Sequence, residues 1–94
     1  MTRENYFAFK KALKGFVCNI TKKGDYITIK PDECDEFSTT KDVLPRYLDK
    51  AGIEYDFDKF QFFGIIHTEY GDLEWVSGWH CNTLVYSARY KIVD

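Results

Sequence analysis

Apolar and polar positions in the first part of the chain recur with a helical period. Four apolar residues, spaced by three, four and three positions, fall on one helical face: Tyr6, Phe9, Leu13 and Phe16. Thr2 is a candidate N-cap, and Gly15 is a candidate C-terminal stop because glycine accepts positive φ. We therefore predict an amphipathic helix whose aromatic face packs into the core.

Two runs rich in β-branched and aromatic residues follow, at positions 16–21 and 26–30. The segment 22–25 between them is typical of a hairpin turn, with Gly24 at positive φ. Ile27 and Ile29 share one face of the second strand, so we expect both to point inward. Pro31 would end that strand because it lacks a backbone N–H donor.

The next periodic segment predicts a second amphipathic helix. Its apolar face comprises Val43, Leu44, Tyr47, Leu48 and Ala51. Pro45 is tolerated only in the first turn of a helix, so the boundary is expected at Lys41 or Asp42. Gly52 followed by Ile53 fits a Schellman ending, in which Ile53 folds back on Leu48.

From residue 54 onwards the pattern is that of β-strands. Acidic and aromatic residues alternate over 54–58, and the apolar run 60–70 is predicted as one long strand with a bulge or close backbone approach at Gly64. Gly71 and Asp72 are predicted as a two-residue hairpin turn.

Two further strands are expected at 73–79 and 83–93, and the last alternates apolar with mixed positions. Trp75 and Trp79 have the same parity, so we expect them to be buried together or exposed together.

The predicted element order is αββαβββ. We therefore expect a single α+β domain over residues 1–94, with two layers: two amphipathic helices on an antiparallel sheet of about five strands. Hydrophobic residues make up 45% and aromatic residues 18% of the 94 positions, so a short chain can still build a core.

Location is inferred from three features of the sequence. No apolar run approaches the roughly 20 residues needed to span a bilayer, so no membrane association is expected. The chain does not open with a secretory signal, and its three cysteines cannot all pair with one another. We therefore expect reduced thiols and a cytoplasmic protein.

The net charge of −2 conceals a strong segregation along the chain. Residues 1–24 carry +5, residues 25–58 carry −6 and residues 59–94 carry −1. Two faces of opposite potential would result if the fold keeps these segments apart. The alternative is that the segments fold against each other and pair.

Candidate chemistry is sparse. The candidate metal donors are Cys18, Cys34, Cys81, His67 and His80. Only His80 and Cys81 are adjacent in the sequence, and adjacent residues on a strand point to opposite faces. We therefore expect no metal site. Cys81 with His67 lacks any flanking motif of a nucleophilic pair. The chain has no P-loop or GxGxxG motif, so we expect no cofactor and no enzyme.

Binding to a protein fits this composition best. Aromatic residues with polar tips are enriched at interface hot spots, and carboxylates can dock on clusters of Arg and Lys. The expected partner-binding residues are Asp32, Glu33, Asp35, Glu36, Glu54, Asp56, Tyr70, Trp75 and Trp79. Our hypothesis is a small non-catalytic inhibitor that occupies a macromolecular partner. Small size without catalytic motifs suits phage and mobile-element inhibitors, including anti-CRISPR proteins that block a host defence nuclease.

Three alternatives remain open at this stage. A nucleic-acid-binding domain would use Lys10, Lys11, Lys14, Lys22 and Lys23 with nearby rings, although the pI of about 5.6 argues against it. An enzyme or small-ligand protein would need a concave pocket. A homodimer could form through the last strand, if that strand lies at an edge of the sheet.

Overall fold

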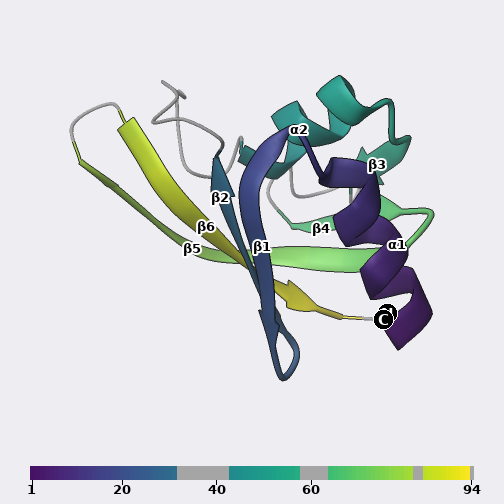
Figure 1. Ribbon diagram of the computed structural model, residues 1–94. Coiled ribbons are helices and arrows are strands. Elements are labelled where there is room, and N and C mark those ends of the chain that lie inside the picture. Colours follow the sequence, from purple (N-terminus) through teal and green to yellow (C-terminus); the bar gives the residue numbers. More distant parts are fainter. Residues whose placement is uncertain (32–42, 58–63, 82–83, 94) are drawn as a thin grey trace.

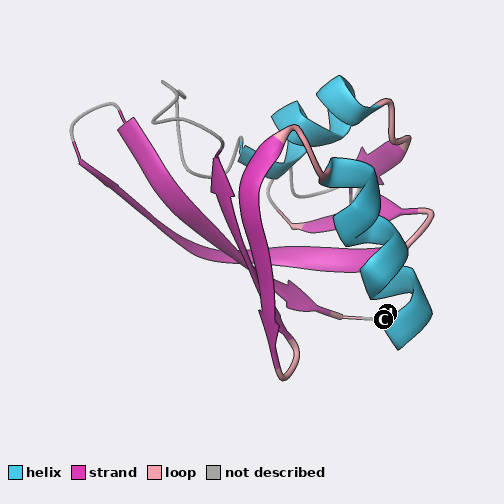
Figure 2. Ribbon diagram, viewed as in Figure 1, coloured by secondary structure: helices cyan, strands magenta, loops and turns pink. Residues whose placement is uncertain are grey.

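The computed structural model describes residues 1–31, 43–57, 64–81 and 84–93. Its elements in chain order are α1 (Arg3–Leu13), β1 (Val17–Lys23), β2 (Tyr26–Pro31), α2 (Val43–Ala51), β3 (Tyr55–Phe57), β4 (Ile65–Thr68), β5 (Gly71–Cys81) and β6 (Leu84–Ile92) (Figure 1). The strands form one twisted antiparallel sheet in the order β1-β2-β6-β5-β4-β3. Both helices lie on the same side of this sheet (Figure 2). The α+β class is confirmed, with six strands in place of about five.

Helix α1 begins and ends as its sequence predicts. The Thr2 hydroxyl accepts a hydrogen bond of 3.1 Å from the backbone N–H of Asn5, and Gly15 follows the helix with a φ of +93°. The side chains of Tyr6, Phe9 and Leu13 are buried against the sheet. Phe16 does not belong to this face, because the helix ends at Leu13 and the Phe16 side chain is exposed.

Helix α2 ends in the predicted Schellman motif. The N–H of Ile53 donates to the carbonyl of Leu48 at 3.0 Å, and the N–H of Gly52 donates to that of Asp49 at 3.2 Å. Gly52 has a φ of +71°, and the Ile53 side chain is buried. Pro45 occupies the first turn, where backbone N–H groups have no acceptor within the helix, so its missing N–H costs no hydrogen bond.

The β1–β2 hairpin is also confirmed. Lys23 pairs with Tyr26 across a turn formed by Gly24, at a φ of +61°, and Asp25. Ile27 and Ile29 of β2 are fully buried, as their alternation predicts.

The turn between β4 and β5 differs from the prediction. Thr68 pairs with Gly71, so the two turn residues are Glu69 and Tyr70, and Gly71 begins the next strand. The Thr68 hydroxyl explains the shift, because it accepts from the N–H of Tyr70 at 3.2 Å and donates to the carbonyl of Gly71 at 2.8 Å.

The predicted long strand 60–70 is not one strand in the described part of the chain. β4 begins at Ile65, and Gly64 lies in a bend immediately before it. Residues 58–63 lie outside the described residues. β3 pairs with β4 and is the additional strand of the sheet.

The last strand lies inside the sheet. β6 pairs with β2 over Ala88–Lys91 on one side and with β5 on the other. The expectation that this strand lies at an edge of the sheet is therefore wrong over Ala88–Lys91, because its backbone pairs with both neighbours there. The homodimer itself stays a prediction. Tyr90 of β6 is fully buried, and its hydroxyl accepts a hydrogen bond of 3.2 Å from the N–H of Leu44 in the first turn of α2.

Candidate functional site: the open face of the sheet

One face of the sheet packs against the helices, and we call the opposite face the open face. Ile27, Ile29, Ala88 and Tyr90 point into the core. Since strand side chains alternate, their neighbours along β2 and β6 point to the open face, and these are Tyr26, Thr28, Lys30, Ser87, Arg89 and Lys91. No helix among the described residues covers this face.

A β-bulge in β5 places Trp79 on the open face. Trp75 pairs with Tyr90 and Ser77 pairs with Arg89, so Val76 is an extra residue in β5. The bulge reverses the parity of the three residues that follow it, Ser77, Gly78 and Trp79. Trp75 consequently packs against the core, whereas Trp79 is 61% exposed. The prediction that the two tryptophans share a face is wrong for this reason.

Three large side chains form a diagonal across neighbouring strands of the open face. Trp79 of β5 faces Ser87, Arg89 of β6 faces Ser77 and Thr28, and Tyr26 of β2 faces Lys91. Diagonal neighbours on one sheet face are close enough for long side chains to meet. The guanidinium carbon of Arg89 lies 4.1 Å from the centroid of the Tyr26 ring. We refer to these three residues, Trp79, Arg89 and Tyr26, as the diagonal.

Charge is segregated between the two halves of the sheet. The adjacent strands β1, β2 and β6 contain five basic residues and no acidic one, and we call them the basic half. The adjacent strands β5, β4 and β3 contain three acidic residues and no Lys or Arg, and we call them the acidic half. Four cations of the basic half occupy open-face positions: Lys23, Lys30, Arg89 and Lys91.

These four cations form no ion pair with a carboxylate of the described residues. All are exposed, and no Asp or Glu oxygen of the described residues lies within 4 Å of their charged nitrogens. Lys91 faces Glu74 in the pairing of β5 with β6, yet the two do not form an ion pair. Within the part of the chain that the structure describes, the basic half therefore presents four exposed cations without an ion-pair partner.

The acidic half carries a row of three polar side chains across its strands. Asp56 faces His67, and His67 faces Asp72. His67 Nδ1 lies 3.1 Å from an Asp72 carboxylate oxygen, and the Asp56 carboxylate accepts a 2.8 Å hydrogen bond from the N–H of Phe57. No group of three or more His, Cys, Asp and Glu side chains suited to a metal occurs in the described part of the chain.

Only one of the predicted aromatic anchors lies on the open face. Trp79 does, whereas Trp75 packs against the core and Tyr70 lies in the β4–β5 turn with its ring 5.9 Å from that of Phe9. Glu54 and Asp56 are exposed at the β3 edge, in the acidic half. The predicted acidic loop residues lie outside the described residues: Asp32, Glu33, Asp35 and Glu36.

The basic residues predicted for nucleic-acid binding are exposed, and they are divided between the helix side and the open face. Lys10, Lys11 and Lys14 belong to the C-terminal end of α1, which lies far from the β1–β2 turn in Figure 1. Lys22 points to the helix side, with its Nζ 5.9 Å from the centroid of the Tyr6 ring. Lys23 alone joins the open face.

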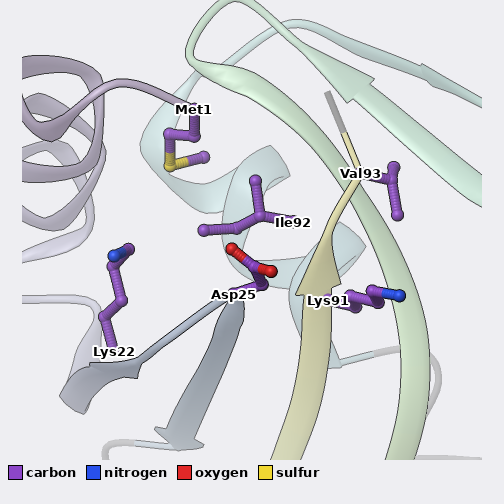
Figure 3. A pocket seen from close by; sticks show the side chains of 6 residues that line it. All are labelled: Met1, Lys22, Asp25, Lys91, Ile92 and Val93. Atoms are coloured by element: carbon purple, nitrogen blue, oxygen red, sulfur yellow. The ribbon is translucent and has the colours of Figure 1, made fainter.

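A pocket of about 440 Å³ lies between the start of α1, the β1–β2 turn and the end of β6. Figure 3 shows Asp25 flanked by Lys22 and Lys91 on opposite sides, with Met1 and Ile92 nearby. A second pocket, of about 590 Å³, follows α2 and is lined by Asp49, Gly52, Ile53, Glu54 and Tyr55. In it the Tyr55 hydroxyl donates to the Asp49 carboxylate at 2.9 Å, and burial, together with this hydrogen bond and the negative charge of Asp49, raises the pKa of Tyr55 above 10.0.

The chain was compared with protein families, with curated proteins and with solved structures. None of the three comparisons found a match. Within the described residues, no helix is both long and apolar enough to cross a membrane.

Sequence reasoning missed Lys30, Arg89 and Lys91 as site residues. Their alternation with apolar neighbours did place them on a polar strand face, but the order of strands was not known. The pairing of β6 with β2 brings residues about 60 positions apart side by side, and no local pattern encodes that pairing.

Proposed function

We propose that this protein is a non-catalytic protein-binding module that acts as an inhibitor by occupying a macromolecular partner through its open face. The observation that supports this proposal is the diagonal of Trp79, Arg89 and Tyr26. Trp, Arg and Tyr are the three residue types most enriched at interface hot spots.

The surroundings of the diagonal also suit a protein contact. Ser77, Ser87 and Thr28 lie beside it with short side chains, and the side chain of Val76 in β5 is 39% exposed. Lys30 and Lys91 are exposed beside the diagonal and supply charged groups of the kind found in the rim of an interface.

The test is affinity capture from a lysate of the source organism or its host, with nuclease treatment, using a matched pair of variants. Trp79→Ala removes an exposed ring from the open face, and Phe7→Ala removes a 52% exposed ring from α1. Because both rings are exposed, each change should alter the free energy of unfolding by less than about 1 kcal/mol.

We expect a discrete protein that survives nuclease treatment, is lost with Trp79→Ala and is retained with Phe7→Ala. Equal capture by both variants would contradict the assignment of the open face. Loss of every captured species on nuclease treatment would contradict a protein partner.

Single-stranded nucleic acid is a second candidate, favoured by the four open-face cations beside exposed aromatic residues. Nuclease treatment in the same capture experiment distinguishes a nucleic-acid partner from the protein partner of the proposed function.

A further inference from the structure

We infer that the partner surface docking on the basic half is an acidic polypeptide surface, an inference that rests on the proposed function. Its basis is the set of four open-face cations, Lys23, Lys30, Arg89 and Lys91, which have no carboxylate of the described residues within 4 Å. The sequence-based expectation had the opposite sign, with acidic residues of this chain docking on a basic partner.

Arg89 gives the surface its selectivity for carboxylates. The guanidinium lies against the ring of Tyr26, which restricts its orientation on an otherwise flexible side chain. A guanidinium held in this way can donate two parallel N–H bonds to one carboxylate. Lys30 lies on the same strand as Tyr26, and Lys91 lies on the neighbouring strand. Both add point charges around the contact between Arg89 and Tyr26.

The two halves of the sheet favour a protein over a nucleic acid. A nucleic acid is negative along its whole backbone, so a strand that continued past the basic half would meet Asp72, Glu74 and Asp56. A protein surface can carry both signs and can match both halves. In addition, Arg89 already occupies one face of the Tyr26 ring, where a base would stack.

The test measures binding of two labelled probes to the purified full chain by fluorescence anisotropy. The probes are an oligoglutamate peptide and an oligothymidylate, each of about 20 units, at about 50 and 200 mM NaCl so that screening is varied. The test variant is Lys30→Glu/Lys91→Glu, and the matched control is Lys10→Glu/Lys14→Glu on α1, with the same change in net charge. Circular dichroism verifies that each variant is folded.

We expect oligoglutamate to bind the native chain, with affinity falling as salt rises. The dissociation constant should rise about tenfold in the open-face variant and less than about twofold in the α1 variant. Arg89→Lys keeps the charge but loses the planar fork, so its dissociation constant should rise about threefold or more.

Tighter binding of oligothymidylate than of oligoglutamate would overturn the inference in favour of nucleic acid. Equal losses in the two charge-reversed variants, or no binding of either probe, would also overturn it. The capture experiment tests the proposed function separately. If capture of a protein still depends on Trp79, only the inference of an acidic partner surface has failed, and the proposed function stands.

Discussion

Arg89 and Tyr26 illustrate how single residues of the open face depend on their register. They lie on neighbouring strands, and Arg89 faces Thr28, two residues from Tyr26, so the guanidinium reaches the ring along the diagonal. The alternation of apolar and polar residues in both strands indicated that each side chain lies on the polar face. It did not indicate that they meet, because the contact depends on a pairing between distant segments.

Tyr55 provides a prediction at the same scale. Its hydroxyl donates to Asp49, and burial with this contact raises its pKa above 10.0. A raised pKa in the folded state means that the stabilisation is present below the unfolded pKa and is lost as the pH rises through the folded pKa.

We therefore expect Tyr55→Phe to be less stable than the native chain at neutral pH, by less than about 1 kcal/mol, and the difference to shrink above about pH 10. Urea denaturation of both chains at neutral pH and at about pH 11 measures this. A stability difference that does not change with pH would contradict the assigned contact.

Helix α2 is the element that the sequence defined most completely. Its apolar positions, the proline in its first turn and its Gly52–Ile53 ending were all predicted, because each depends on residues within a few positions of one another. The signals of a helix are local, and this one needed no knowledge of the sheet.

Gly52 supplies a prediction for this element. At a φ of +71° an L-residue is strained, and no atom lies within 4 Å of an added Cβ, so the cost is conformational and not steric. Gly52→Ala should lower the free energy of unfolding by about 1 kcal/mol, and Gly52→Asn by less, because Asn tolerates this conformation. Thermal and urea denaturation measure both. An equal loss in the two variants would contradict a purely conformational cost.

The β5 strand shows where local patterns fail. The bulge at Val76 and the early turn at Glu69 and Tyr70 each shift the alternation by one or two positions. Neither feature has a distinctive sequence. The bulge contains no glycine, and the turn is stabilised by the Thr68 hydroxyl. The Gly71-Asp72 pair, in contrast, predicted a turn that does not form. A single unrecognised bulge was enough to reverse the predicted face of Trp79.

The charge pattern of the sheet follows from the order of its strands. Along the chain, residues 59–94 are almost neutral. Because β6 lies between β2 and β5, its cations adjoin those of β1 and β2 on one side, while Lys91 faces Glu74 of β5 on the other. The segregation in the sheet therefore differs from that along the chain: Lys30 of the basic half comes from the acidic segment 25–58, and Asp72 and Glu74 of the acidic half come from residues 59–94.

The central claim is that the open face, and not the helical layer, contacts the partner. Photo-crosslinking tests it most directly, with a benzophenone side chain at Ser77, which faces Arg89, or at Lys11 on α1; both positions are exposed. In the nuclease-treated lysate, we predict one discrete protein adduct from position 77 and none from position 11. Adducts from position 11 alone, or equal adducts from both positions, would contradict the account.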